Sequence, residues 1–180
     1  MRIIAGSRKG HTIHAPKGLG TRPTGDRVRE AAFNLIGPVD GAAVLDLYAG
    51  SGAMGLEALS RGAASAVFVE ADPDAARTIE RNLDRLRLTG ATVLHRDART
   101  ALAGEAGANR TYDLVLVDPP YGEWPRLESR LAPYLATVLA PDGLVVVETA
   151  SRVEPSLPLA QRTSRRYGSA RLTLFEHPDA

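Results

Sequence analysis

The sequence predicts an α/β fold in which a mostly parallel, seven-stranded sheet carries helices on both faces. Short apolar runs alternate with stretches of helical periodicity from residue 43 onward. These runs are apolar at consecutive positions, as expected for parallel strands buried between two helical layers. The chain ends in two strand-like segments close enough to form an antiparallel hairpin. Right-handed crossovers leave few topologies for such a sheet.

The first part of the chain predicts a short extension followed by a helix. Within residues 1–20, "RIIA" and "HTIHA" have the composition of two strands around a glycine-containing turn, which predicts a β-hairpin. Residues 21–37 predict a leading helix that Thr24 caps and Gly37 ends. Its apolar face consists of Val28, Ala32, Leu35 and Ile36.

The α/β core of the chain is expected to span residues 43–180. "AVLDL" predicts the first strand, and a helix that Gly62 ends follows a glycine-rich turn. "AVFVE" predicts the second strand, after which Asp72 caps a helix that begins with proline. "ATVLHRD", "YDLVLVD" and "GLVVVE" predict three more strands, with the helix "RLESRLAPYLATVLA" between the last two. "RRYGSARLTLFE" predicts the closing hairpin, and no repeat or linker divides residues 1–180, which we expect to form one domain.

Composition and charge narrow the functional classes. The absence of cysteine excludes disulfides and thiolate catalysis, and the four histidines are scattered, so we expect no metal site. No apolar run resembles a signal peptide or a membrane span, which favours a cytoplasmic protein. The net charge is +1, but residues 1–29 carry +6, residues 30–150 carry −7 and residues 151–172 carry +4. Basic ends suit a partner with phosphates, although almost all these cations are arginine, which also fits a compositional bias.

A glycine-rich loop follows the first predicted strand. Gly50-x-Gly52-x-x-Gly55 comes directly after the strand and opens a helix, which is the context of a dinucleotide-binding loop. Asp46 at the end of the strand opposes that interpretation, because a carboxylate repels a pyrophosphate. A carboxylate suits an ammonium or a sulfonium instead. S-adenosylmethionine carries both, and its small amino-acid part could lie over a loop where glycine lets the backbone come close.

Two further acids end the next two predicted strands. Glu70 is placed to accept the hydroxyls of a ribose, and Asp97 is placed to accept from an adenine amino group. Each acid could instead be a helix cap, Asp97 above all. Together they match one adenosine-bearing ligand that extends across adjacent strands. The predicted cofactor-binding residues are Asp46, Tyr48, Ala49, Gly50, Ser51, Gly52, Gly55, Glu70, Ala71, Asp97 and Ala98.

The fourth predicted strand ends in "DPPY", which we interpret as the catalytic segment. Pro119 and Pro120 have fixed φ angles and no N–H, so the segment is rigid and rich in carbonyls. An oxygen of Asp118 and a proline carbonyl form a paired acceptor for an exocyclic amino group, and Tyr121 can stack on the base that carries it. Two acceptors favour tetrahedral geometry at the nitrogen, which frees its lone pair to attack a methyl group. The alternative for this motif by itself is a turn that only ends the strand.

The pieces "RIIAGSRKG", "TRPTGDRVREAAFN", "DLYAGSGAMGLEALSRGA" and "DLVLVDPPYG" together resemble the bacterial small-subunit ribosomal RNA guanine-N2 methyltransferase family. The resemblance extends from Arg2 to about Glu148. It implies a Rossmann-like class I methyltransferase fold and transfer of a methyl group from S-adenosylmethionine to a guanine N2 amine in 16S ribosomal RNA. The substrate would be the small subunit or its assembly intermediate, and the enzyme a monomer with no metal and no membrane partner.

The resemblance also implies where RNA binds. The "TRPT" segment would lie near the active site, with Arg22 and Arg27 as phosphate contacts. His11 and Thr12 stand where a more basic run is expected, which lowers the expected RNA affinity but not the chemistry. The full set of predicted RNA contacts is Arg8, Lys9, Lys17, Arg22, Thr24 and Arg27.

Other functions stay open at this point. The same chemistry could act on adenine N6, on cytosine N4 or on a protein glutamine. DNA enzymes usually need an added target-recognition region, and glutamine methyltransferases favour Asn where Asp118 stands. A nicotinamide dehydrogenase fits the glycine loop but not Asp46 or DPPY. A non-catalytic RNA-binding module would use the basic ends alone.

Overall fold

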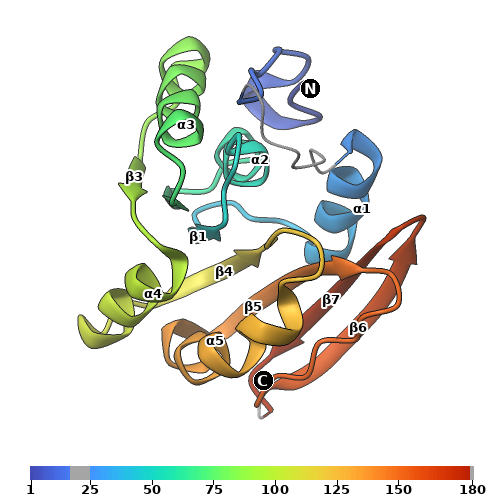
Figure 1. The fold of residues 1–180 in the computed structure, drawn as a ribbon. Helices are drawn as coiled ribbons and strands as arrows, with labels where there is room; N and C mark the ends of the chain where they lie inside the picture. The colour runs from blue at the N-terminus through green and yellow to red at the C-terminus, as the bar shows by residue number, and fades with distance from the viewer. Residues whose placement is uncertain (17–24, 179–180) are drawn as a thin grey trace.

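The computed structural model of the protein describes residues 1–16 and 25–178, and its strands form a single seven-stranded sheet (Figure 1). The strand order is β3-β2-β1-β4-β5-β7-β6. The pairs among β1 to β5 are parallel, and β7 is antiparallel to both β5 and β6. The predicted fold class is confirmed. The strands are β1 (Ala43–Leu47), β2 (Ser65–Glu70), β3 (Ala91–His95), β4 (Tyr112–Val117), β5 (Leu139–Ala150), β6 (Ala160–Tyr167) and β7 (Ala170–Glu176).

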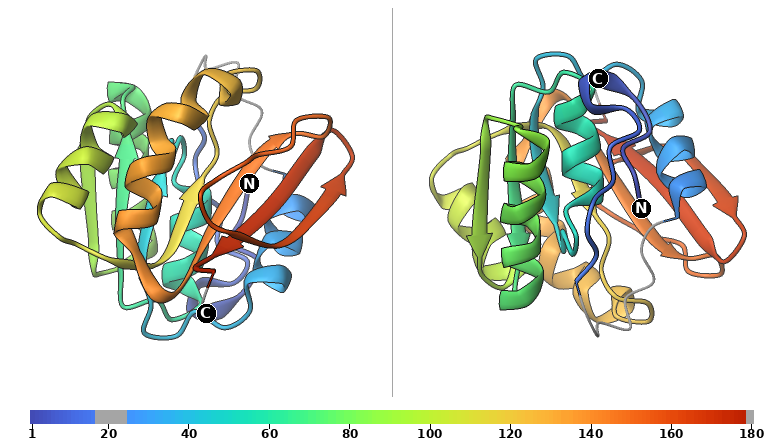
Figure 2. Two further views of the ribbon diagram at one scale, coloured as in Figure 1. Left: turned by 90° about the horizontal axis from the view of Figure 1, so that it is seen from below. Right: turned by 90° about the horizontal axis from the view of Figure 1, so that it is seen from above.

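Helices cover both faces of the sheet, as the two views of Figure 2 show. The first apolar core lies under α1, α2 and α3, and the second lies under α4 and α5. Alternate residues of each central strand enter opposite cores: Val44 packs in the first and Leu45 in the second. The helices are η1 (Gly6–Arg8), α1 (Asp26–Ile36), α2 (Ala53–Ser60), α3 (Pro73–Leu86), α4 (Ala98–Gly107) and α5 (Trp124–Val138).

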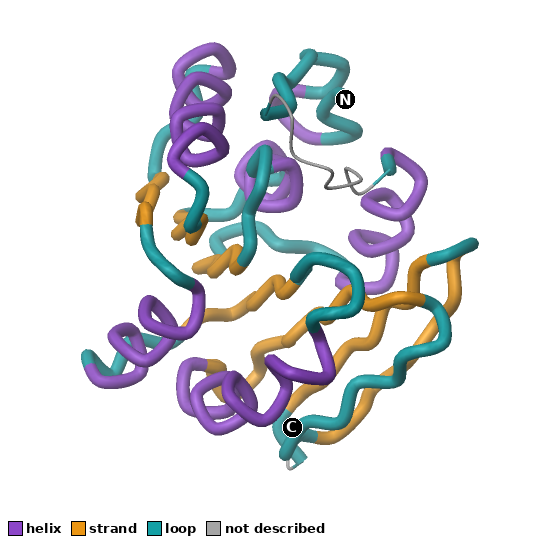
Figure 3. The backbone as a smooth tube through the Cα atoms, in the orientation of Figure 1, coloured by secondary structure: helices purple, strands orange, loops and turns teal. Residues whose placement is uncertain are grey.

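The N-terminal arm, residues 1–16, packs against α2 (Figure 3). The predicted hairpin is present as one antiparallel bridge between Arg2 and Thr12 rather than as two full strands. A buried side chain explains the difference: the Glu57 carboxylate accepts the N–H groups of Ile4 at 2.8 Å and Ala5 at 2.9 Å. Those groups therefore bond to a helix rather than to a partner strand.

Several elements differ from the prediction in their bounds, and one helix was not predicted. Helix α1 begins at Asp26 with Gly25 as its N-cap, and the predicted cap Thr24 lies outside the described residues. Helix α4 has no counterpart among the predicted segments, because its two glycines dilute the apolar pattern. Strand β5 begins at Leu139, four residues before the predicted "GLVVVE", with a register shift against β4 near its start.

Candidate active site

The loop between β1 and α2 has an unusual backbone. Tyr48, Gly50 and Gly52 have φ angles of +60°, +56° and +78°. Such values suit glycine and strain other residues, so the tyrosine marks a position where the surrounding structure imposes the conformation. The N–H of Gly52 donates to the Ala49 carbonyl at 2.7 Å, which closes the turn. A side chain at Gly50 would meet only one backbone oxygen, at 4.0 Å, so this side of the loop is open for a ligand to approach.

Asp46 lies beneath this loop and is only 2% exposed. Its Oδ2 accepts the N–H of Gly55 at 2.9 Å, which ties the end of β1 to the first turn of α2. Burial raises the pKa of Asp46 to about 7, the Gly55 hydrogen bond opposes this rise, and the charges of Asp118 and Glu70 add to it. The carboxylates at this edge of the sheet therefore repel one another, and a cationic ligand would relieve that repulsion.

Gly55 is required by packing rather than by its backbone angles. A Cβ at this position would lie 2.3 Å from the Phe68 ring of β2 and 3.0 Å from Oδ2 of Asp46. The helix therefore approaches the sheet closely only because residue 55 has no side chain. This is the role of the third glycine in nucleotide-binding loops of this kind.

The other two predicted strand-end acids are engaged by backbone donors. Glu70 accepts the N–H of Gly50 at 2.7 Å and that of Asp72 at 2.8 Å. Asp97 caps α4 by accepting the N–H of Thr100 at 2.9 Å, so its interpretation as a helix cap is correct. A carboxylate accepts about four hydrogen bonds, so both residues retain acceptor capacity. Their contacts to ribose and adenine stay predictions.

The neighbouring predicted cofactor residues have different surroundings. Ala71 is exposed, and its carbonyl lies 3.0 Å from Nε2 of His95, whereas Ala98 is buried in the second core. The side chain of Tyr48 is half-buried, and burial, with the charges of Asp97 and Glu123, raises its pKa to about 12.

Asn82 holds the glycine loop against the N-terminal arm, and no sequence pattern marked it. Its side chain is fully buried on α3. Its Nδ2 donates to the carbonyls of Ser51 and His14, both at 3.0 Å, and its Oδ1 accepts the N–H of His14 at 2.8 Å. The position of Ser51 therefore depends on a residue 31 positions away in the chain.

The DPPY segment leaves β4 beside the glycine loop. Val117 pairs with Leu47 of β1, and the N–H of Asp118 lies 3.5 Å from the Leu47 carbonyl. Asp118 is half-buried, Pro119 is buried, and Tyr121 is 47% exposed. An exposed aromatic ring at this edge is available to stack on a base. The structure thus brings Asp46, Glu70, Asp97 and Asp118 to the carboxyl ends of adjacent strands, where ligands bind in sheets of this type.

Glu148 belongs to the same edge, and the sequence interpretation missed it. It follows Val147 of β5, which pairs with Val117 of β4, and it is 8% exposed. It lines a hollow together with Pro119, Pro120 and Tyr121. The signal that identified the other acids, a carboxylate after an apolar run, is present in "GLVVVE" as well.

The chain matches the family model described as Conserved hypothetical protein 95 over residues 1–176. It belongs to this family. The Escherichia coli K12 protein named ribosomal RNA small subunit methyltransferase D is 40% identical over 159 residues, which cover 88% of this chain and 78% of that protein. Bacillus subtilis YlbH, a candidate rRNA methyltransferase, is 42% identical over 161 residues, which cover 86% of this chain and 85% of that protein. The resemblance to bacterial small-subunit rRNA methyltransferases is confirmed.

Solved structures support the same fold. The Escherichia coli protein yhhF, a candidate methyltransferase, aligns with a TM-score of 0.84 at 34% identity, covering 98% of both chains. S-adenosylmethionine-dependent methyltransferases align with TM-scores of 0.67 to 0.68 at 14% to 18% identity, and at that identity they show the fold alone. This member of the Conserved hypothetical protein 95 family therefore has the Rossmann-like methyltransferase fold expected from the sequence.

The predicted RNA contacts of this family member are only partly described. Arg8 donates from Nε to the Leu86 carbonyl and from Nη2 to the Arg87 carbonyl at 3.2 Å, so its guanidinium caps the C-terminal end of α3. Lys9 and Arg27 are exposed. The other predicted contacts, Lys17, Arg22 and Thr24, lie outside the described residues.

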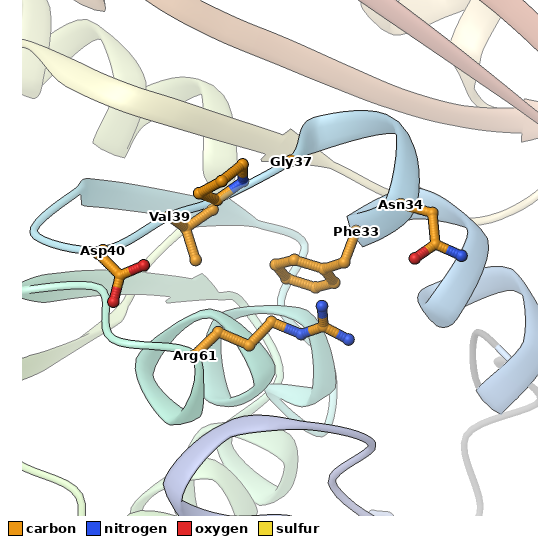
Figure 4. Close-up of a pocket in the computed structure, with 7 residues that line it drawn as sticks. Phe33, Asn34, Gly37, Val39, Asp40 and Arg61 are labelled. Carbon is orange, nitrogen blue, oxygen red and sulfur yellow. The ribbon is translucent and has the colours of Figure 1, made fainter.

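A second hollow lies away from this edge (Figure 4). It is lined by the end of α1, the turn before β1 and Arg61 at the end of α2, whose guanidinium lies 4.5 Å from the Phe33 ring centroid. These segments precede β1 and β2, so the hollow lies at the opposite edge of the sheet from Asp46 and Asp118. Within residues 1–16 and 25–178, no group of three metal-ligating side chains occurs, and no helix is long and apolar enough to span a membrane.

Proposed function

We propose that this protein transfers a methyl group from S-adenosylmethionine to the exocyclic N2 amine of a guanine in 16S ribosomal RNA. The observation that carries the proposal is the position of DPPY directly beside the glycine loop and Asp46, at the carboxyl ends of β1 and β4. DPPY would act there as a paired acceptor for an amino group. The substrate is the small subunit or its assembly intermediate, and the protein acts in the cytoplasm as a monomer.

The residues at the strand ends fit the cofactor. The open side of Gly50 accommodates its amino-acid part, and the buried carboxylate of Asp46 suits a cation, whereas a pyrophosphate would be repelled. Glu70 and Asp97 would hold the ribose and the adenine. When bound, S-adenosylmethionine supplies an electrophilic methyl group on a sulfonium.

The chain's own residues prepare the amine for attack. One oxygen of Asp118 and the Pro119 carbonyl accept the two amino hydrogens, while the Tyr121 ring stacks on the base. This arrangement turns the nitrogen lone pair toward the methyl group. The N–C bond would form as the methyl group leaves the sulfonium sulfur, which keeps the bonding electron pair as a neutral thioether. Asp118 stabilises the positive charge on nitrogen and then accepts the proton that the methylated amine releases.

The identity of the acceptor base rests on the family. Relatives named as rRNA methyltransferases favour ribosomal RNA over DNA or protein. The paired acceptor itself would also suit adenine N6 or cytosine N4, so the choice of guanine comes from the resemblance in the four sequence pieces. A non-catalytic RNA-binding module is disfavoured because it has no need for a buried carboxylate beneath an open glycine loop.

Complementation tests this function in a cell. An Escherichia coli strain that lacks the relative would express this chain or its Asp118→Asn variant, and nucleosides from its 16S RNA would be separated by mass spectrometry. We expect N2-methylguanosine to increase with the wild-type chain and not with the variant. An increase in N6-methyladenosine instead would keep the chemistry and overturn the base assignment.

A further inference from the structure

We propose that Glu148 is the residue that selects guanine, by accepting the N1–H of the target base. This inference rests on the proposed function and adds to it the group that distinguishes guanine from adenine and cytosine. It concerns a residue that neither the glycine loop nor the DPPY motif contains.

The sheet register places Glu148 next to the catalytic aspartate. Strands β4 and β5 are parallel, and Val117 pairs with Val147. Asp118 and Glu148 are the residues that follow this last pair, on strands that lie about 4.8 Å apart where they are paired. A base whose amino group reaches Asp118 thus presents the adjacent part of its edge to Glu148.

The surroundings of Glu148 favour a hydrogen bond that its carboxylate accepts from the substrate. The residue is 8% exposed and lines the same hollow as Pro119, Pro120 and Tyr121. A buried carboxylate is stabilised by hydrogen-bond donors, and a base that presents a ring N–H supplies one. Glu148 already has an interaction within the chain, but a carboxylate accepts about four hydrogen bonds and so retains capacity for a base.

The chemistry of the base edge explains the selection. In guanine, one of the two ring nitrogens beside the C2 amino group, N1, carries a hydrogen, so N1–H and N2–H form two adjacent donors. In adenine and cytosine, the ring nitrogen beside the amino group is a bare acceptor. A carboxylate facing that lone pair would be repelled and would lose a hydrogen bond in a buried site, and enzymes reject such analogues strongly. Glu148 therefore admits guanine and excludes the other two amino-bearing bases.

A modified RNA separates this role from a structural one. 2-Aminopurine keeps the amino group at C2 but has a bare N1 and no O6 carbonyl, so it removes the hydrogen that Glu148 is proposed to accept together with O6. The change in the preference for guanine in the Glu148 variants isolates the part that depends on N1. The substrates are an RNA that carries the target guanine and the same RNA with 2-aminopurine at that position. The measurement is kcat/KM for each. We expect the wild-type protein to prefer guanine by roughly 100-fold or more.

The Glu148→Gln variant should lose much of this preference. Its side-chain amide can rotate to donate to the bare N1, so we expect the guanine to 2-aminopurine ratio to fall by about tenfold or more. Glu105→Gln is the matched control, because Glu105 is 6% exposed on α4 and bonds to Arg110 and Tyr112 instead of lining the hollow. That variant should keep the wild-type ratio. Glu148→Asp retains the charge and should also prefer guanine, at a lower rate.

Three outcomes would overturn the assignment of Glu148. The wild-type protein could methylate 2-aminopurine as well as guanine, Glu148→Gln could slow both substrates equally, or Glu148→Gln could leave both rates unchanged. The first outcome is measured on the wild-type protein, so it can overturn the proposal even if Glu148→Gln fails to fold. A wild-type protein that methylates neither RNA nor the small subunit, while it binds the cofactor, would instead contradict the proposed function.

Discussion

Replacing Asp46 with Asn should stabilise the protein while weakening its binding to the cofactor. Asp46 is 2% exposed, and its pKa is raised to about 7, chiefly by burial. An acid with a raised pKa in the folded state favours folding at low pH, and that contribution is lost as the pH rises from the unfolded pKa, 3.8, through about 7. The ionised carboxylate therefore destabilises the fold above neutral pH.

The magnitude follows from the two pKa values. At 1.36 kcal/mol per unit of pKa difference, ionisation of Asp46 lowers the free energy of unfolding by on the order of 4 kcal/mol. Asparagine does not ionise, and its amide oxygen can still accept the N–H of Gly55. Its buried NH2 group offsets part of the gain, so we expect Asp46→Asn to be more stable at pH 8 by about 2–4 kcal/mol. Without the negative charge, cofactor affinity should fall roughly tenfold to 100-fold.

Urea unfolding at two pH values measures this effect. The stability difference between Asp46→Asn and the wild-type protein should be about 2 to 3 kcal/mol larger at pH 8 than at pH 5. Calorimetry with S-adenosylhomocysteine and S-adenosylmethionine gives the affinities in parallel. An equal stability difference at both pH values would refute the reasoning about burial, and unchanged cofactor affinity would refute the role of the charge.

Three further predictions concern the loop, the catalytic segment and the basic residues. Asp118→Asn should retain cofactor binding and slow single-turnover methyl transfer by roughly two to three orders of magnitude, and an unchanged rate would remove its assigned role. Gly55→Ala should lower stability by about 1–3 kcal/mol, because its Cβ would lie 2.3 Å from an aromatic ring of β2. Its control, Gly104→Ala in open space on α4, should raise stability by about 0.5–1 kcal/mol, and equal melting shifts would contradict the packing account. Replacing Arg22 and Arg27 with Ala should weaken RNA binding. The slope of the logarithm of the binding constant against the logarithm of salt concentration should become shallower by about two, and an unaltered slope would exclude both residues as phosphate contacts.

Local signals were sufficient for strands β1 to β4, but not for helix α4 or for the start of β5. The apolar runs of β1 and β4 and the Asp72 cap of α3 depend on neighbouring residues, so the pattern located them. The N-terminal arm could not be predicted in this way. Its backbone donors bond to Glu57, more than 50 positions away, and no periodicity contains that contact.

The location of the acids of the candidate site was also predicted, whereas their ligand contacts stay predictions. Acids after apolar runs correctly indicated a single edge of the sheet, because parallel strands place their carboxyl ends together. The pattern could not show that Asp46 bonds to Gly55, since this contact depends on how α2 packs against the sheet. It left open whether Asp97 caps a helix or binds a ligand, and the structure shows the cap. Glu148 belongs to no motif, so it was missed, although it too is an acid that follows an apolar run.

Transfer of a methyl group to a guanine amine can be tested in one incubation. Purified protein would be mixed with methyl-tritiated S-adenosylmethionine and small ribosomal subunits from a strain that lacks the corresponding enzyme, and the RNA would be digested to nucleosides. We predict that the label elutes as N2-methylguanosine and that DNA in a parallel reaction stays unlabelled. Label in another nucleoside would contradict the guanine assignment. Absence of label from subunits, naked RNA, DNA and protein alike, with cofactor binding intact, would contradict the account as a whole.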